Sequence, residues 1–114
     1  MHELGIIFSI IKSVEEVGAE NALTKVESVT LDIGEVSGIV PVFLTDCWKW
    51  ATEKSELLKG SELKIEQIDA VTFCEGCQQT YATVPQGKIC PHCQSDKTYL
   101  VTGNEVSIRE IEAQ

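Results

Sequence analysis

The first apolar stretch of the chain repeats at the spacing of a helix. Its apolar side chains recur every three or four positions from residue 4 to residue 17, which favours an amphipathic α-helix that is well buried on one side. The positions are Leu4, Ile6, Ile7, Phe8, Ile10, Ile11, Val14 and Val17. Gly18 follows the last of them and is predicted to end the helix, because glycine readily adopts the conformation of a helix C-terminus.

A strand and a second helix are predicted next. Val29, Leu31 and Ile33 alternate with polar residues, which is the pattern of a strand buried on one face. The turn-forming residues 34–38 interrupt that strand, and Pro41 suits the first turn of a helix. The apolar face of this helix is formed by Leu44, Cys47, Trp48 and Ala51.

Cys47 and Trp50 are the two residues of the second helix whose roles are open. Cys47 lies on the apolar face, so we expect a buried thiol that fills space rather than a reactive one. Trp50 points away from Trp48, and we expect it to be half buried, with a place in a partner surface as the alternative.

Two later segments, 62–68 and 105–111, carry the same irregular strand pattern. In each, the alternation of apolar residues slips at the same place, which indicates a bulge or twist. We expect the two strands to be neighbours in one sheet, with residues 72–102 inserted between them as a separate lobe. The sequence therefore predicts an α+β fold, with two helices packed on a small three-stranded sheet and an inserted lobe. The predicted domains are 1–71 plus 103–114, and 72–102.

The inserted lobe contains two Cys-x-x-Cys pairs separated by twelve residues, Cys74 with Cys77 and Cys90 with Cys93. This is the spacing of two metal-binding turns that face each other. Four thiolates around one ion leave no open coordination position, so the pattern predicts a structural zinc site. The lobe is too small to bury a core of its own, and we expect the metal to hold it together. The predicted α+β fold thus contains an inserted zinc-ribbon-like lobe.

Three other interpretations compete for these cysteines. Two structural disulfides would require a secretory context, which nothing in the sequence supports. A thioredoxin-type redox pair lies between a strand and a helix, whereas these pairs lie among turn-forming residues. Iron also accepts four sulfur ligands, so a rubredoxin-like iron site is the main competitor to zinc.

Composition excludes several classes of partner. The 9 lysines and arginines face 18 aspartates and glutamates, which gives a formal net charge of −9. A nucleic-acid-binding surface needs basic residues to neutralise phosphates, so we expect neither DNA nor RNA binding, and acidic membranes are disfavoured for the same reason. No apolar run is long enough to span a bilayer, and no signal peptide is evident. We expect a cytoplasmic protein, where thiols stay reduced and free for metal.

The chain start, Met1-His2-Glu3, offers nitrogen ligands for a second metal. A bulky second residue generally prevents removal of the initiator methionine. The Met1 amine, the His2 amide and the His2 imidazole can then close two chelate rings on one ion, with the Glu3 amide or another donor completing a square plane. Such coordination suits Ni(II) or Cu(II) better than Zn(II). The plainer interpretation is a solvated histidine and a glutamate that favours the helix dipole.

Four motifs occur together and in order: Met1-His2-Glu3-Leu4, Ile33-Gly34-Glu35-Val36-Ser37, the double Cys-x-x-Cys, and Thr102-Gly103-Asn104-Glu105. With this ordered set the chain resembles, over essentially its whole length, the HypA/HybF nickel metallochaperones of NiFe-hydrogenase maturation. The resemblance implies a nickel-binding domain and a zinc domain. It also implies that His2 is the essential nickel ligand, helped by the Met1 amine and Glu3, and that the four cysteines hold zinc.

The resemblance further implies how such a chain works. The family delivers nickel to the precursor of the hydrogenase large subunit together with a HypB-type GTPase, and some members serve urease. Relatives can carry a nickel-approaching carboxylate before the second helix, where this chain has Val40; Glu35 is only a conjecture for that role. His92 is expected to be an exposed side chain of the second cysteine turn. No catalytic motif is present, so we expect no enzyme activity.

Two other classes of function stay open at this point. One is a zinc-ribbon adaptor without nickel delivery, and the other is a rubredoxin-like electron carrier. The chain could be a monomer or a homodimer, since insertion of a lobe between two strands of one sheet permits strand exchange.

Overall fold

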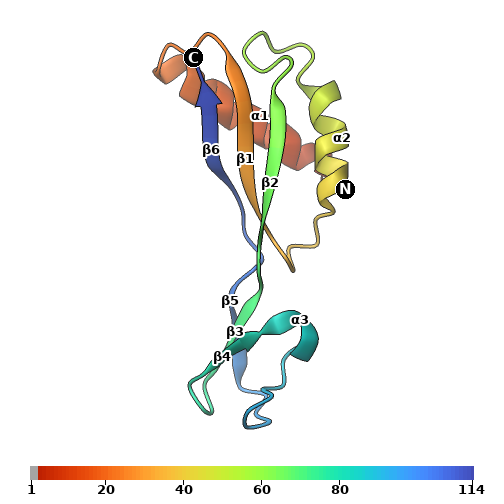
Figure 1. The fold of residues 1–114 in the computed structure, drawn as a ribbon, viewed down its shortest axis with the longest axis vertical. Coiled ribbons are helices and arrows are strands. Elements are labelled where there is room, and N and C mark those ends of the chain that lie inside the picture. The colour runs from red at the N-terminus through yellow and green to blue at the C-terminus, as the bar shows by residue number, and fades with distance from the viewer. Residues whose placement is uncertain (1–2) are drawn as a thin grey trace. The chain divides into compact units, whose positions relative to one another are not determined.

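The computed structural model describes residues 3–114, which form an α+β structure of three helices and six strands in two sheets, as predicted for the fold class (Figure 1). The chain divides into two compact units. The first contains the residues up to Asp32, together with Ile39–Glu66 and Ser107–Gln114. The second contains Ile33–Gly38 and Gln67–Val106.

Helix α1 spans Glu3–Glu20, and its buried side chains are Ile7, Ile10, Ile11 and Val14. The prediction that Gly18 ends the helix is wrong, because the helix continues for two more residues. A Cβ atom at Gly18 would lie 2.6 Å from Leu57 Cδ2, so the glycine permits close packing of Leu57. The chain changes direction just after the helix, at Ala22, whose φ of 53° lies in the left-handed region.

Three residues of the predicted apolar stripe on α1 are exposed. Leu4 is 41% exposed, Phe8 is 48% exposed and Val17 is 37% exposed. The buried residues of α1 follow the 7, 10, 11, 14 row, and positions 4 and 8 lie at the margin of that row. The apolar stripe in the sequence is therefore wider than the buried face of the helix, and the residues at the margin of the stripe are exposed to solvent.

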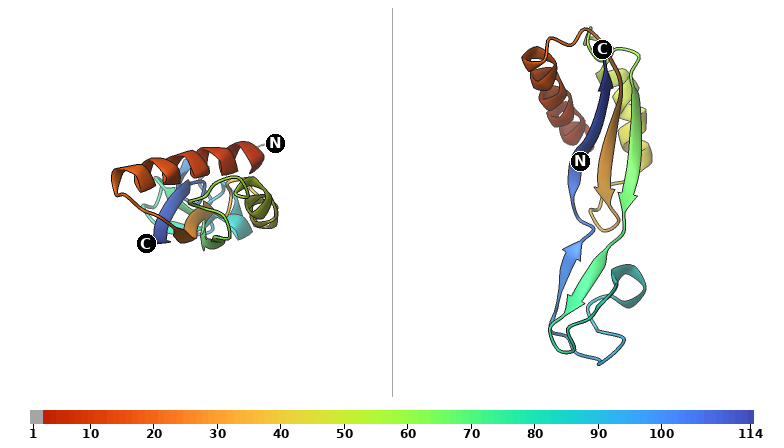
Figure 2. Two further views of the ribbon diagram at one scale, coloured as in Figure 1. Left: turned by 90° about the horizontal axis from the view of Figure 1, so that it is seen from above. Right: turned by 60° about the vertical axis from the view of Figure 1, so that its left-hand side comes forward.

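Helix α2 spans Pro41–Ala51 and packs against α1, with Pro41 in its first turn as predicted (Figures 1 and 2). Leu44 and Trp48 are buried, and Trp48 Nε1 donates a hydrogen bond to Ser61 Oγ at 3.0 Å. The expectation of a buried Cys47 is wrong, since this residue is only half-buried.

Trp50 is 59% exposed rather than half-buried. Its ring meets the ring of Phe8 edge to face, with centroids 6.3 Å apart. The two exposed aromatic side chains therefore shield part of each other's surface at the contact between α1 and α2.

The sheet of the first unit contains β1 (Val26–Gly34), β2 (Glu62–Ile68) and β6 (Val106–Ala113) in the order β2-β1-β6. The two strands with matching patterns share a sheet as predicted, but they are not neighbours because β1 lies between them. This order follows from burial. Val26, Val29 and Leu31 of β1 are fully buried, whereas most residues of β2 and β6 are exposed.

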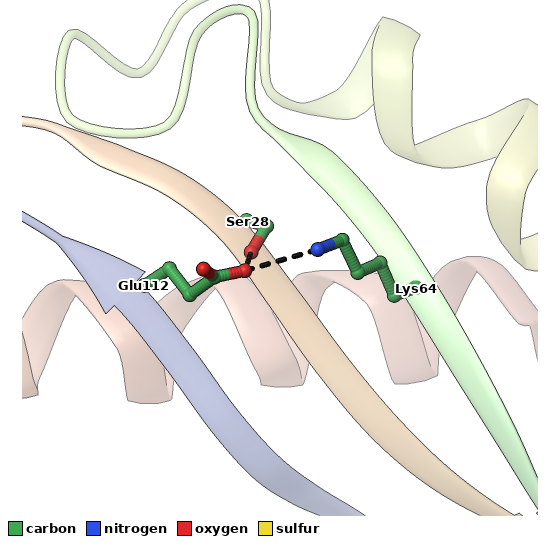
Figure 3. Close-up of polar contacts among 3 residues, drawn as sticks. All are labelled: Ser28, Lys64 and Glu112. Carbon is green, nitrogen blue, oxygen red and sulfur yellow. Dashed lines mark hydrogen bonds and ion pairs between the residues drawn. The ribbon is translucent and has the colours of Figure 1, made fainter.

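Ser28 and Thr30 are buried although they alternate with the apolar core residues of β1, and a polar network covers Ser28. Ser28 Oγ donates to Glu112 Oε1, and Lys64 Nζ lies 3.0 Å from the same oxygen, so one carboxylate links all three strands (Figure 3). Arg109 Nε donates to Asp32 at 2.6 Å.

The same contacts show where the alternation of side chains between the two faces of β6 is interrupted. Residues three apart in a regular strand point to opposite faces. Arg109 and Glu112 nevertheless contact Asp32 and Ser28, which share one face of β1. The side-chain alternation therefore shifts by one residue between positions 109 and 112, as the irregular spacing of the sequence indicates.

The second unit contains β3 (Val71–Cys74), β4 (Thr80–Ala82), the short helix α3 (Thr83–Gln86) and β5 (Thr98–Thr102). The strands form an antiparallel sheet in the order β4-β3-β5, so the ends of the inserted segment pair with each other. Phe73 and Tyr99 stack across β3 and β5 with ring centroids 5.5 Å apart.

Three loop segments of the second unit cross at Gly34, Ala70 and Gly103. Gly34 N donates to Glu105 O and Val36 N donates to Gly103 O, both at 2.8 Å. A Cβ atom at Gly34 would lie 2.0 Å from the carbonyl oxygen of Gly103, and one at Gly103 would lie 2.4 Å from the Cα atom of Ala70. The backbones meet so closely that only glycine fits at these two positions.

Two carboxylates complete this crossing. Glu35 Oε1 accepts a hydrogen bond from Ala70 N at 2.8 Å, which gives Glu35 a structural role in the loops. Glu105 accepts bonds from Gly103 N at 2.5 Å and from Thr102 Oγ1 at 2.8 Å. Its own backbone N–H, the Thr102 hydroxyl and the Gly103 N–H lower the pKa of Glu105. Both glutamates thus satisfy backbone donors that the sheets do not pair.

We predict that Gly34→Ala destabilises the protein by about 2 kcal/mol or more, because the new methyl group meets backbone atoms that cannot move independently. Urea unfolding followed by circular dichroism measures this. Gly38→Ala is the control. Gly38 has a φ of 80° but nothing within 4 Å of its Cβ position, so the loss of stability in this variant comes only from placing alanine in a left-handed backbone conformation. A Gly34→Ala protein as stable as Gly38→Ala would contradict the close crossing.

We also predict a pH-dependent contribution from Glu112. The Ser28 hydrogen bond and Lys64 lower its pKa, so its contribution to stability is present above the unfolded-state pKa and is lost as pH falls through the folded-state value. Glu112→Gln should therefore lower the free energy of unfolding at pH 7 and make little difference in strong acid. Unfolding curves at several pH values test this, with the exposed Glu110→Gln on the same strand as control. A stability difference independent of pH would argue against it.

Candidate metal centre

The two cysteine pairs lie in turns of the same construction. Cys74 is the last residue of β3, and the second pair lies between α3 and β5. Gln78 N donates to Cys74 O at 2.8 Å, and Gln94 N donates to Cys90 O at 2.9 Å. Both glutamines have φ of 61°, in the left-handed region. The repeated Cys-x-x-Cys-Gln sequence, which the sequence analysis did not single out, is the signal of this shared turn.

The four sulfur atoms converge on one point. All lie within 4.8 Å of one another, and the cross-pair distances Cys74–Cys93 and Cys77–Cys90 are both 3.6 Å. A zinc–sulfur bond of about 2.3 Å implies a tetrahedral sulfur–sulfur edge of about 3.8 Å, close to these distances, whereas a disulfide needs about 2.05 Å. All four cysteines are free thiols. The donor set therefore fits a tetrahedral zinc ion, and the disulfide alternative does not hold.

The first cysteines of the two pairs and one tyrosine form a small buried cluster. Cys74 and Cys90 are fully buried, and Tyr81 packs with them. Tyr81 donates its hydroxyl hydrogen to Gly87 O at 2.8 Å. The second cysteines are less protected, since Cys77 is half-buried and Cys93 is exposed.

Burial and the backbone N–H groups around the cluster change the pKa values of its thiols. Burial and the hydrogen bond to Cys90 raise the pKa of Cys77 to about 12. Burial also raises the pKa of Cys90, but the N–H groups of Cys93 and His92 outweigh it and bring the value to about 7. His92 N lies 3.3 Å from Cys90 Sγ. The second turn thus directs backbone dipoles at a thiolate, which is the protonation state that a metal requires. His92 itself is exposed.

Met1 and His2 of the predicted nickel site lie outside the described residues. Glu3 is half-buried at the start of α1 and lines a cavity of about 320 Å³ with Leu4, Phe43, Asp46 and Cys47. The structure therefore brings Glu3 near a second carboxylate residue and a thiol from α2. Sequence reasoning did not connect these residues with Glu3, because they lie more than forty positions away.

A membrane-spanning helix is absent from residues 3–114, where no helix combines the required length with sufficient apolar character.

Comparison with known proteins gives a consistent result. The model of the family described as "Hydrogenase/urease nickel incorporation, metallochaperone, hypA" matches residues 1–113. The hydrogenase maturation factor HypA of Chlorobium phaeobacteroides is 36% identical over 112 residues, and that of Chlorobaculum parvum is 32% identical over 111 residues. In each case the match covers 97% of this chain and 97% of the relative.

A solved structure has the same fold. The solution structure of the nickel metallochaperone HypA from Helicobacter pylori superposes with a TM-score of 0.74 at 25% identity, covering 99% of this chain and 97% of that one. Because the match covers nearly all of this chain, the likeness is not limited to one unit. It confirms the predicted resemblance, and it identifies a metallochaperone rather than an enzyme. The chain belongs to the HypA family of hydrogenase and urease nickel-incorporation metallochaperones.

Proposed function

We propose that the chain binds nickel(II) at its start and delivers it to the large-subunit precursor of a NiFe hydrogenase during maturation. The observation that carries this proposal is the combination of the family match over residues 1–113 with the sequence Met1-His2-Glu3. The partners proposed with it are a HypB-type GTPase and, for some clients, urease accessory proteins. Reduced thiols and a soluble cargo suit the cytoplasm.

The proposed nickel ligands are the Met1 amine, the His2 amide and imidazole nitrogens, and Glu3. Nitrogen donors in a plane suit Ni(II). The amine titrates near pH 8 and the imidazole near 6.5 in model peptides, so protons compete with the metal as pH falls. Glu3 and the neighbouring Asp46 add negative charge on this side of the cavity, which favours a divalent cation.

Transfer requires that the acceptor can replace these ligands one at a time. A site at a chain start uses few side chains and leaves coordination positions open to an incoming ligand. A closed set of four protein ligands would instead hold the ion. The proposed nickel site therefore suits a carrier, and the cysteine site suits a permanent ion.

We further propose that Cys74, Cys77, Cys90 and Cys93 hold structural zinc. The sulfur distances of 3.6 Å match a tetrahedral site, and the cysteines themselves make up much of the buried core of the second unit. When bound, the ion would supply cross-linking between the two turns.

The zinc proposal predicts one zinc per chain in a colourless protein. Elemental analysis and the visible spectrum measure this, and iron with strong visible absorption would instead indicate the rubredoxin-like alternative. Cys90→Ser should lose the ion, because it leaves a fully buried hydroxyl at a thiolate position. Cys47→Ser is the matched control and should keep it, since Cys47 lies in the first unit.

The nickel proposal predicts that His2→Ala weakens nickel binding by at least tenfold, because it removes the imidazole and one chelate ring. Isothermal titration of a protein with an unblocked Met1 amine, confirmed by intact mass, measures this. His92→Ala is the control and should bind normally. Affinity should also fall from pH 8 to pH 6. Unchanged affinity in His2→Ala would favour the adaptor function over nickel delivery.

A further inference from the structure

The four cysteines of the metal cluster differ in their access to solvent. Cys74 and Cys90, the first residue of each pair, are 0% exposed, whereas Cys93 is exposed and Cys77 is half-buried. A reagent that approaches the cluster from solvent therefore meets Cys93 first. Thiolate reactivity depends on such access as well as on charge.

Gly76 widens this access. A Cβ atom at Gly76 would lie 3.4 Å from Cys93 Sγ and 3.1 Å from the Cβ and Oγ atoms of Ser95. The absence of a side chain at position 76, which is itself exposed, therefore leaves one side of the Cys93 sulfur uncovered. The corresponding position in the second turn is His92, which does carry a side chain.

A second sulfur is placed to react with a modified Cys93. Cys74 Sγ lies 3.6 Å from Cys93 Sγ, across the two turns. The other cross-turn pair, Cys77 and Cys90, is equally close. Cys74 is fully buried, so it is protected from external reagents but in contact with Cys93.

We propose that Cys93 is the site at which the zinc-loaded chain reacts with hydrogen peroxide, and that Cys74 then attacks the oxidised sulfur to form a Cys74–Cys93 disulfide. This inference depends on the zinc occupancy proposed above. Oxidation then begins at one cysteine and proceeds in a fixed order, instead of affecting the four cysteines equally.

The two steps balance with peroxide as the only oxidant. The Cys93 thiolate attacks one oxygen of hydrogen peroxide, the O–O bond breaks, and a sulfenic acid and hydroxide are formed. The Cys74 thiolate then attacks the Cys93 sulfur, the S–S bond forms, and hydroxide leaves from the sulfenic acid. Two thiolates lose two electrons, and the peroxide is reduced to two water molecules once two protons are taken up. The donor set falls from four thiolates to two, Cys77 and Cys90.

The test uses zinc-loaded Cys47→Ser protein, in which only the four cluster cysteines remain, after elemental analysis has established one zinc per chain. The protein is treated with hydrogen peroxide, trapped with a sulfenic-acid reagent at early times, and mapped by mass spectrometry. Zinc release is followed with a coloured chelator. We expect the trapped label on Cys93, a later Cys74–Cys93 disulfide, and zinc release in step with that disulfide.

Two outcomes would overturn the proposal: first labelling at another cysteine, or a first disulfide within one pair, such as Cys90–Cys93. A protein without zinc would instead fail at the first measurement and count against the metal assignment, so the two failures are distinguishable.

Gly76→Ala gives an independent test that keeps all four ligands. Its methyl group would lie against Cys93 Sγ, so labelling of Cys93 should be severalfold slower, while zinc content stays at one per chain. The matched control is Ala82→Gly, a small change in the same unit at the end of β4, which should leave the rate unchanged. A Gly76→Ala protein that keeps its zinc and reacts as fast as the parent would refute the role of this opening.

Discussion

The convergence of four thiolates is the constraint on which the second unit depends. Its buried cluster consists of Cys74, Tyr81 and Cys90, with Cys77 packed against it. Several of its larger apolar side chains are exposed instead, namely Val84, Ile89, Tyr99 and Val101. Burial of so few apolar groups does not offset the conformational entropy of ordering this segment. Zinc binding to structural sites contributes about 10–16 kcal/mol in small peptides, so the proposed zinc ion would stabilise this unit where apolar burial does not.

The first unit is stabilised in a different way. Its core is made of aliphatic side chains together with Trp48, and the central strand β1 buries residues on both faces. Burial of Ser28 would be costly without partners, and Glu112 and Lys64 remove that cost by closing a hydrogen-bonded network across the sheet. No buried side-chain polar atom among the described residues lacks a partner. The first unit therefore needs no metal to account for its order.

The motifs that carried the family resemblance divide into two physical kinds. The four cysteine sulfur atoms converge on one point, where their arrangement fits a tetrahedral metal ion. The motifs around Gly34 and Gly103, by contrast, interlock through backbone contacts and through Glu35. A motif that marks a family in sequence can thus serve the path of the backbone, and its presence does not by itself indicate a ligand.

The sequence predicted the two longer helices, the first sheet's strands and the cysteine cluster well but not the short α3, because periodicity and fixed ligand spacing are local signals that a helix of one turn lacks. It failed where the answer depended on distant residues. Gly18 looked like a helix end because nothing local reveals Leu57 packing against it. In the order β2-β1-β6, the central strand is the one that is buried on both faces. The sequence of β1 does not reveal this, because Ser28 and Thr30 are polar and look like solvent-facing residues although they are buried. The cavity beside Glu3 likewise combines residues from two helices.

The two proposed metal sites can be compared through the order in which their ligands are released. A tetrahedral site with two buried and two outer thiolates must lose an outer ligand first, so its resistance to exchange is set by its most exposed member, Cys93. The proposed nickel site has no equivalent inner layer among the described residues, since Glu3 lies at the margin of a shallow cavity. On these two proposals the same chain holds one ion in a closed set of four thiolates and releases another from a site with fewer side-chain ligands, so the two exchange rates differ.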